Sequence, residues 1–269
     1  MKHGNLKAAC FSVAAMDYFP QRGERYAGGN ALNQAVRFRD LGWNTAFLGS
    51  LGTDSAGDRI EDLLSRSGVD LSRMRRIPGE TACNELINDE QGERFGVEGA
   101  WKNGVYPEYA LSDEDWAYIA DFPVWSTHAN GNNYSEALKR KGPDNFLAVD
   151  YLHFDTYDEL KAGLGIVDIA YFGGREEQLP ELAELSRQSE TLIVLTLGAG
   201  GSIALRRGDS FLQEALPLDP VVDTTGCGDA FQAGFTDSFF RNRNIPAALL
   251  AGAELGRIAA SFPGGVPWR

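Results

Sequence analysis

Hydrophobic residues along the chain gather in two kinds of run, which follow one another in turn. Short apolar runs without strict alternation are typical of parallel strands that are covered on both faces of a sheet. These runs are residues 7–15, 45–49, 146–151, 166–172 and 191–197. Runs with helical spacing separate or follow them, at residues 30–41, 55–67, 229–240 and 246–262. The alternation predicts an α/β protein with a doubly wound, mostly parallel sheet flanked by helices.

One stretch departs from this alternation. Residues 81–88 and 93–97 are short extended runs joined by a Gly-containing segment at residues 89–92, which predicts a β-hairpin. Because the hairpin interrupts the βα units, we expect an insertion over approximately residues 78–100 that projects as a small flap or lid. The whole of residues 1–269 is otherwise predicted to form a single domain.

Composition and charge restrict the partners of the chain. Hydrophobic residues make up 43% and charged residues 23%, which is typical of a globular protein. The 25 Lys and Arg residues face 38 Asp and Glu residues, so the formal net charge is −13. This field repels a phosphate backbone, and we expect no nucleic-acid partner. A phosphate ligand remains compatible where backbone amides at a helix N-terminus bind it.

The cysteines and the N-terminal residues indicate a location in the cell. Cys10, Cys83 and Cys227 lie far apart and form no CxxC pair, so neither a disulfide framework nor a thiolate zinc site is expected. Asp17 interrupts the first apolar stretch before it reaches membrane-spanning length. We therefore expect a cytoplasmic protein without a signal peptide or membrane association.

The segment at residues 221–235 carries the clearest chemical signal. Gly226, Cys227 and Gly228 lead directly into a predicted helix, whose first amides have no partners and can bind an anion. Asp229 places a carboxylate beside that anion. Such a carboxylate can accept the proton of a hydroxyl that attacks a phosphate. The competing interpretation is an ordinary first-turn acid stabilised by the helix dipole.

Two parts of the chain together carry a family resemblance. Residues 223–235, DTTGCGDAFQAGF, resemble the C-terminal signature of the ribokinase-like (PfkB) carbohydrate kinases, with Cys227 where alanine is usual. Residues 28–35 and 49–57, GGNALNQA and GSLGTDSAG, are similar to the first signature of that family. The short length, residues 111–122 and the aromatic C-terminal ending most resemble the fructoselysine 6-kinases within it.

The resemblance implies a reaction and a catalytic group. It implies ATP-dependent phosphorylation of a primary hydroxyl of a small sugar or sugar–amine adduct, such as position 6 of a fructoselysine-like compound. It also implies that Asp229 is the catalytic base and that the amides of Gly226, Cys227 and Gly228 form the anion hole. Both roles agree with the interpretation reached from the residues themselves.

The resemblance extends to the acceptor site. The residues that it implies for acceptor binding are Asp17, Gly29, Asn30, Asn33 and Asp229. Asp17 follows the first predicted strand, where a carboxylate can accept two sugar hydroxyls, although a turn residue is the alternative. Asn33 is the better candidate of the two asparagines, since Asn30 can be explained as an N-cap.

Residues 196–202, TLGAGGS, follow a predicted strand and resemble the nucleotide loop of the family. The ATP-binding residues that this implies are Thr196, Gly198, Gly201, Gly226 and Gly228. A Gly-rich turn at this place lets the backbone approach a nucleotide closely.

Two acidic residues are candidates for binding cations. Glu177 occupies the position of the acid in the NxxE motif that organises Mg²⁺ in the family, but Gly174 stands in place of the asparagine, and Glu176 competes as the acid. Mg²⁺ is still expected, because it mainly bridges the phosphates of ATP. Asp223 resembles a residue of a monovalent cation site, which implies activation by K⁺; the alternative is a turn residue after a strand at residues 220–222.

Several alternatives stay open. A nucleoside kinase of the same family and a non-catalytic sugar or nucleotide sensor are the main ones, whereas a Rossmann dehydrogenase is disfavoured because no GxGxxG follows the first strand. His128, Asp150 and Glu98 have no assigned role. The two carboxylates, or the acidic surface in general, would suit a cationic acceptor. An edge hairpin could also pair across a homodimer.

Overall fold

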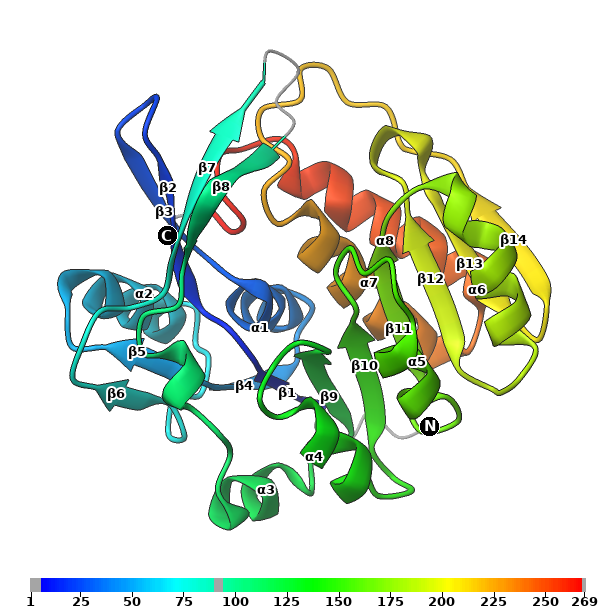
Figure 1. The fold of residues 1–269 in the computed structure, drawn as a ribbon, viewed down its shortest axis with the longest axis horizontal. Coiled ribbons are helices and arrows are strands. Elements are labelled where there is room, and N and C mark those ends of the chain that lie inside the picture. Colours follow the sequence, from blue (N-terminus) through cyan, green and yellow to red (C-terminus); the bar gives the residue numbers. More distant parts are fainter. Residues whose placement is uncertain (1–5, 90–93, 268–269) are drawn as a thin grey trace.

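The structure is a computed structural model that describes residues 6–89 and 94–267 of the chain. Its main feature is a sheet of eight strands in the order β14-β13-β12-β11-β10-β9-β1-β4 (Figure 1). The parallel strands are β1 (Lys7–Phe11), β4 (Asn44–Leu48), β9 (Val124–His128), β10 (Phe146–Asp150), β11 (Ile169–Gly173) and β12 (Leu192–Thr196). The antiparallel strands β13 (Ser202–Arg206) and β14 (Asp209–Gln213) complete one edge. The predicted mostly parallel sheet is confirmed.

Helices cover both faces of this sheet. Successive side chains of each strand point to opposite faces, and apolar side chains on both faces need to be buried. In β1, Ala8 and Cys10 belong to one hydrophobic cluster, whereas Ala9 and Phe11 belong to the other. The first cluster includes residues of α1 (Asn30–Asp40), α2 (Ser55–Arg66), α7 (Cys227–Asn242) and α8 (Ile245–Ala259). The second includes residues of α3 (Asp113–Ile119), α4 (Tyr134–Arg140), α5 (Asp158–Gly163) and α6 (Leu179–Ser186).

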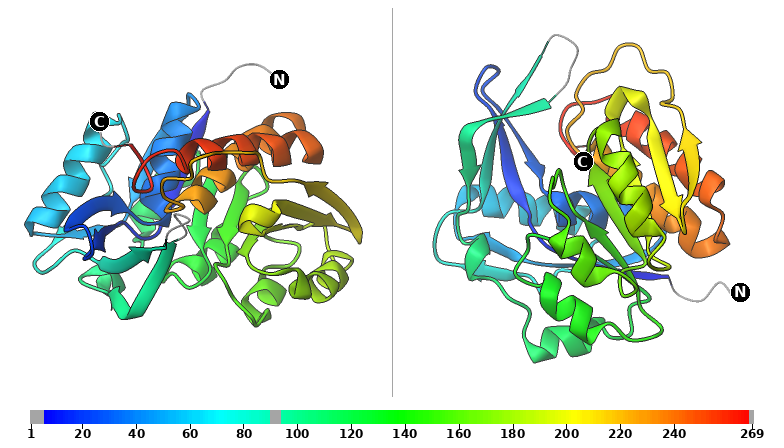
Figure 2. Two further views of the ribbon diagram at one scale, coloured as in Figure 1. Left: turned by 90° about the horizontal axis from the view of Figure 1, so that it is seen from above. Right: turned by 45° about the vertical axis from the view of Figure 1, so that its right-hand side comes forward.

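A second sheet of four strands stands beside the first, as both views of Figure 2 show. Its order is β3-β2-β7-β8, with β2 (Ala15–Phe19), β3 (Glu24–Gly28), β7 (Cys83–Asn88) and β8 (Arg94–Lys102). Strands β7 and β8 pair antiparallel, as expected, although the predicted turn at residues 89–92 lies mostly outside the described residues. The antiparallel pair β2–β3 was not predicted, and β2 pairs in parallel with β7.

Short elements complete the fold. Strands β5 (Ser50–Gly52) and β6 (Arg75–Ile77) form a small parallel sheet of their own. The 3₁₀ helices are η1 (Tyr106–Glu108), η2 (Glu176–Gln178) and η3 (Gly198–Gly200). No helix within residues 6–89 and 94–267 is long and apolar enough to cross a membrane.

Two predicted strands are wrong in detail. Residues 7–15 do not form one strand, because β1 ends at Phe11 and the chain turns before β2. Within this turn the Val13 carbonyl accepts a hydrogen bond from the Ala31 amide at 3.1 Å, which ties the turn to α1. Residues 220–222 form no strand either; the Val222 amide instead donates to the Ala260 carbonyl, just after α8, at 2.9 Å.

Candidate active site

The carboxylate of Asp229 is the meeting point of three elements. Asp229 lies in the first turn of α7, and Asn33 of α1 donates from Nδ2 to its Oδ2 at 2.7 Å. Asn30, the first residue of α1, donates from Nδ2 both to Asp229 Oδ1 at 3.0 Å and to Asp150 Oδ2 at 3.1 Å. Asp150 is the last residue of β10. The starts of α1 and α7 therefore meet at the carboxyl end of a central strand, where ligands bind in open α/β sheets.

Burial, together with the nearby Asp150 carboxylate, raises the pKa of Asp229 to about 7. The hydrogen bonds from Asn33 and Asn30 and the positive charge of Arg94 oppose this rise in pKa. Desolvation also raises the pKa of Asp150 above its ordinary value. A carboxyl group that ionises close to neutral pH is suited to accept a proton during a reaction.

Asp17 belongs to the same electrostatic neighbourhood. It lies in β2 and is buried. Desolvation, together with the Asp229 and Asp223 carboxylates, raises its pKa to about 7 against the opposing charge of Arg94. Its carboxylate covers Gly28, where an added Cβ would lie 2.1 Å from Asp17 Oδ2. The structure therefore brings Asp17 and Asp229, which are far apart in sequence, under mutual charge influence.

Glycine at position 29 is explained by the backbone. Gly29 is the N-cap residue of α1 and has φ of +100°. A Cβ at this position would lie 2.7 Å from the Val13 carbonyl oxygen. Gly29 therefore lets the chain enter α1 beside the turn after β1, and the adjacent Asn30, which could be explained as an N-cap, instead directs its side chain to the two carboxylates.

The predicted anion hole is open at two of its three amides. Gly226 has φ of +72°, and a Cβ there would lie 2.5 Å from the Gly265 Cα atom. Gly228 is exposed, and a Cβ there would meet no atom within 4 Å. The amides of these two glycines donate no hydrogen bond within the described part of the chain. The Cys227 amide, by contrast, donates to the Thr224 carbonyl at 3.2 Å and is not free for a phosphate.

The predicted nucleotide loop follows β12. The Thr196 hydroxyl donates to the Phe172 carbonyl at 3.1 Å, which leaves its side chain turned toward β11. Gly198 has φ of +57° and open space around a Cβ, as a ligand-facing position requires. Gly201 has φ of +91°, and a Cβ there would lie 2.2 Å from the Gln213 carbonyl oxygen. Close packing against β14 is enough to explain Gly201.

Glu177 is exposed in η2, with Oε2 4.0 Å from Arg175 Nε. At Gly174, where the family has an asparagine, a Cβ would lie 2.0 Å from Gln178 Oε1. The Gln178 side chain thus fills the space of the missing asparagine, and its Nε2 donates to the Phe154 carbonyl at 3.2 Å. Within the described residues no three His, Cys, Asp or Glu side chains gather as a metal site.

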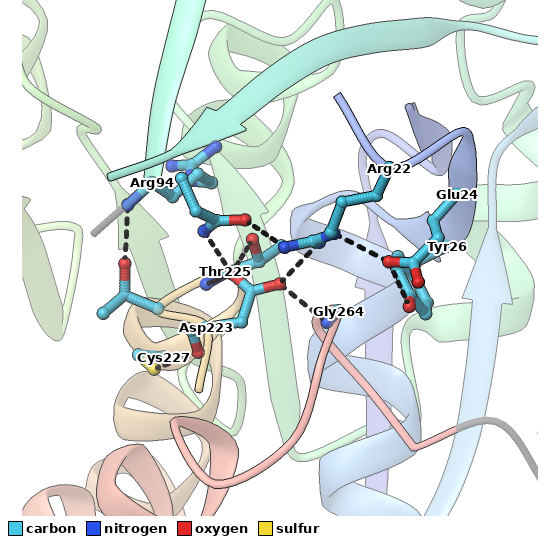
Figure 3. Close-up of polar contacts among 10 residues, drawn as sticks. Arg22, Glu24, Tyr26, Arg94, Asp223, Thr225, Cys227 and Gly264 are labelled. Atoms are coloured by element: carbon cyan, nitrogen blue, oxygen red, sulfur yellow. Dashed lines mark hydrogen bonds and ion pairs between the residues drawn. The ribbon is translucent and has the colours of Figure 1, made fainter. Parts of the chain in front are cut away.

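Asp223 does not fit the monovalent cation site that the family resemblance implies. Its carboxylate is fully buried and accepts hydrogen bonds from the Thr225 amide at 2.9 Å and hydroxyl at 2.6 Å (Figure 3). Asn88 Nδ2 and the Gly264 amide also donate to it, each at 3.0 Å. Three of these donors face Oδ1 and one faces Oδ2, so Oδ1 has no lone pair left for a cation. Asp223 is a buried acceptor that joins several segments, and its bond from the Thr225 amide is also that of a turn residue.

Four buried polar atoms near this site have no partner among the described residues: Ser12 Oγ, Asn30 Oδ1, Asn33 Oδ1 and His128 Nδ1. Ser12 follows β1 and His128 ends β9, so both lie at the same edge of the sheet as Asp150. Burial lowers the pKa of His128 to about 4, and the ring is therefore neutral at pH 7. Buried atoms without partners are costly unless a ligand or water satisfies them.

Three further residues can be placed: Asp150 and Glu98, to which the sequence assigned no role, and Arg94, which was not predicted. Asp150 lies within the site, whereas Glu98 is exposed on β8. Arg94, at the start of β8, affects the pKa of both Asp17 and Asp229. Arg94 lies close to these two carboxylates only because the four-stranded sheet lies over α7, and no local sequence pattern indicates that arrangement.

Known proteins resemble the chain along nearly all of its length. It is 31% identical over 258 residues to the fructoselysine 6-kinase of Escherichia coli (strain K12), covering 93% of this chain and 95% of that protein. It is 28% identical over 276 residues to a fructosamine kinase of Bacillus subtilis (strain 168), covering 98% of this chain and 95% of that protein. Among solved structures, the adenosine kinase of Sinorhizobium meliloti has a TM-score of 0.83 at 20% identity, covering 99% of this chain and 97% of that one.

The family assignment rests on the match of residues 17–267, which begins at Asp17 and includes both signatures, to the pfkB family of carbohydrate kinases. The ribokinase-like arrangement of a mostly parallel sheet flanked by helices agrees with this match. The relatives that cover nearly the whole chain are named kinases. This chain therefore belongs to the pfkB family of carbohydrate kinases and is a sugar or nucleoside kinase.

Proposed function

We propose that this kinase transfers the γ-phosphate of ATP to the primary 6-hydroxyl of a fructoselysine-like sugar–amine adduct, with Asp229 as the catalytic base. The observation that carries the proposal is the position of Asp229, held by two asparagine amides next to the open amides of Gly226 and Gly228. The similarity to a fructoselysine 6-kinase and a fructosamine kinase supports the choice of acceptor.

The reaction follows from the placement of charge. The attacking hydroxyl loses its proton to an Asp229 carboxylate oxygen as its oxygen bonds to the γ-phosphorus, and ADP leaves on the opposite side. The amides of Gly226 and Gly228 donate to the phosphoryl oxygens, whose negative charge they stabilise. Glu177 would hold the water of a Mg²⁺ ion carried by ATP, which would neutralise part of the phosphate charge. The loop with Thr196, Gly198 and Gly201 would contact the nucleotide.

The acceptor site is built for a hydroxyl-rich molecule. Asp17 and the oxygen atoms of Asn30 and Asn33 are buried acceptors, and the two asparagine oxygens have no partner among the described residues. Sugar hydroxyls would supply the missing donors. The carboxylates of Asp17 and Asp150 also favour a positively charged amine on the acceptor.

The four-stranded sheet would serve as a lid over the acceptor. Strand β2 contributes Asp17, and β8 brings Arg94 close to Asp229. Closure of this sheet on a bound sugar would exclude water and so limit hydrolysis of ATP. The outer strand β8 exposes Phe95 and Trp101, which are 51% and 42% accessible. We infer that a second copy of the chain covers this edge, as a homodimer formed through the lid.

Rates of ADP release over a panel of acceptors test the substrate. The panel contains fructoselysine, other glycated amino acids, fructose, ribose and adenosine. We expect kcat/KM to be highest for a glycated amino acid and low for adenosine. Equal constants for fructoselysine, fructose and ribose would refute the role of the amine, and the highest constant for adenosine would favour a nucleoside kinase.

A further inference from the structure

Three segments of the four-stranded sheet converge on the residues just before the phosphate-binding glycines (Figure 3). From the end of β7, Asn88 Nδ2 donates to Asp223 Oδ1 at 3.0 Å. From the turn between β2 and β3, Arg22 Nη2 lies 4.0 Å from Asp223 Oδ2. From the start of β8, the Arg94 amide donates to Thr224 Oγ1 at 3.0 Å. The sheet is thus joined to the loop that leads into Gly226.

Arg22 is held in a defined position. Its Nη1 donates to Asn88 Oδ1 at 2.8 Å, and its Nε forms an ion pair with Glu24 Oε2 at 2.7 Å. The guanidinium also lies over the Phe19 ring, 4.3 Å from the centroid. Because the Asn88 amide contacts both Arg22 and Asp223, these three side chains form one connected group.

The C-terminal loop completes this group. The Gly264 amide donates to Asp223 Oδ2 at 3.0 Å. Gly264 has φ of +79°, and a Cβ there would lie 2.8 Å from the Cβ atom of Tyr26, so Tyr26 of β3 packs directly on this residue. Any shift of the β2–β3 hairpin would therefore disturb both the amide and the cation that face Asp223.

The charge of Asp223 needs compensation. A fully buried carboxylate is costly unless hydrogen bonds and a nearby cation stabilise it. Within residues 6–89 and 94–267, Arg22 supplies the one cationic group at ion-pair distance. The carboxylate also accepts three hydrogen bonds at Oδ1 and one at Oδ2, so Oδ1 has no lone pair left for a monovalent cation.

We propose that Arg22 takes the place of a monovalent cation at Asp223, so that closure of the lid, and not binding of K⁺, sets the geometry of the phosphate loop. Arg22, Asn88 and Asp223 act as positioning residues, since none of them contacts the reacting atoms. The inference rests on the proposed role of Gly226 and Gly228 in binding phosphate. It predicts an enzyme that is indifferent to K⁺ until Arg22 is removed.

Binding of a non-hydrolysable ATP analogue with Mg²⁺ tests this proposal without any acceptor, so an incorrect sugar assignment does not affect the result. Calorimetry is performed in tetramethylammonium chloride and in KCl at equal ionic strength. We expect equal affinities for the wild-type protein. For Arg22→Ala in tetramethylammonium we expect about tenfold weaker binding, equivalent to roughly 1.4 kcal/mol. Addition of KCl, or of guanidinium chloride far below denaturing concentrations, should restore most of that affinity.

Two variants keep the test specific. Arg22→Lys retains the charge and should bind the analogue better than Arg22→Ala in tetramethylammonium. Arg25→Ala removes an exposed arginine of the same hairpin, whose guanidinium lies over Tyr18, and should behave as wild type in both salts. Thermal unfolding of each variant verifies that it is folded.

Three results would overturn the proposal. The first is a wild-type protein whose nucleotide affinity depends on K⁺. The second is an Arg22→Ala protein that binds as tightly as wild type in tetramethylammonium. The third is a loss of affinity in Arg22→Ala that neither cation reduces. A wild-type protein that does not bind the analogue at all would instead refute the proposed nucleotide site.

Discussion

The carboxylate of Asp229 is defined by the residues that donate to it. Asn33 and Asn30 favour its ionised form, whereas burial and Asp150 favour its protonated form, and the balance places its pKa at about 7. A base must be ionised to accept a proton, so turnover should fall as the pH drops through about 7. The pKa of Asp229 therefore sets the expected position of the acid limb of the pH–rate profile.

Removal of one donor should move that limb. In Asn33→Ala the Asp229 carboxylate loses the 2.7 Å hydrogen bond that lowers its pKa, so the pKa should rise. We expect the acid limb of kcat/KM to move to higher pH and kcat to decrease. The profile of Gln188→Ala, an exposed residue after α6, should match the wild type. An unchanged acid limb in Asn33→Ala would contradict the hydrogen bond's influence on Asp229.

Asp17 predicts a second pH effect, on stability. Its pKa is about 7 in the folded protein but 3.8 as an ordinary value, so the folded state binds the proton more tightly. Stability from this group is therefore present at low pH and is lost as the pH rises through about 7. Asp17→Asn removes this loss and should raise the Tm at pH 8 more than at pH 5.

Scanning calorimetry at pH 5 and pH 8 measures the Tm gain of Asp17→Asn over the wild type at each pH. The control is Asp158→Asn, which replaces an aspartate whose side chain is 90% accessible and should leave Tm unchanged at both values. A Tm gain for Asp17→Asn that is equal at pH 5 and pH 8 would show that the Asp17 carboxyl does not titrate between them.

Among the elements, the βα units could be predicted because their signal is local. Runs of apolar residues predicted the parallel strands, and the segment beginning at Gly226 predicted the start of α7. The local β2–β3 hairpin was missed because residues 7–15 were predicted as one strand, so no strand was expected between them and α1. The parallel pairing of β2 with β7 was missed because β7 lies far along the chain. For the same reason, the signature residue Asp229 was recognisable, but the contacts of Asp223 with Arg22 and Asn88 were not.

The start of α7 predicts a contrast between its two glycines. Gly228→Ala places a methyl group in open space, and alanine favours a helix by up to about 1 kcal/mol over glycine. We expect an unchanged or higher Tm but weaker binding of the ATP analogue, because the methyl group hinders the approach of a phosphate. Gly226→Ala should lower the Tm, since its φ is +72° and Gly265 leaves no room. Wild-type nucleotide affinity in Gly228→Ala would argue against this phosphate site.

At the scale of the whole molecule, the exposed edge of β8 predicts an assembly. Phe95 and Trp101 present apolar surface on the outer strand of the lid, which an acidic protein with a net charge of −13 would otherwise expose to water. We expect a dimer in light scattering after size-exclusion chromatography. The double variant Phe95→Glu and Trp101→Glu should be monomeric at the same concentration. A wild-type monomer at micromolar concentration would refute the dimer.

The acidic charge of the molecule is also compatible with its phosphate chemistry. In the proposed reaction, the open amides of Gly226 and Gly228 and a metal ion carried by ATP would bind phosphate without a basic surface. The buried carboxylates of Asp17 and Asp150 would then attract the proposed cationic acceptor. The proposed function therefore assigns the two tasks to different groups, amides for the phosphate and carboxylates for the acceptor.

The most direct test of the central claim is the turnover of Asp229→Asn with ATP and the best acceptor of the panel. Asparagine keeps the size of the side chain but cannot accept the proton, so kcat should fall by about 10²–10⁴-fold. Calorimetry should show that the affinity for the ATP analogue stays within a few-fold of wild type. A variant that keeps wild-type kcat would contradict the assignment of Asp229 as the catalytic base.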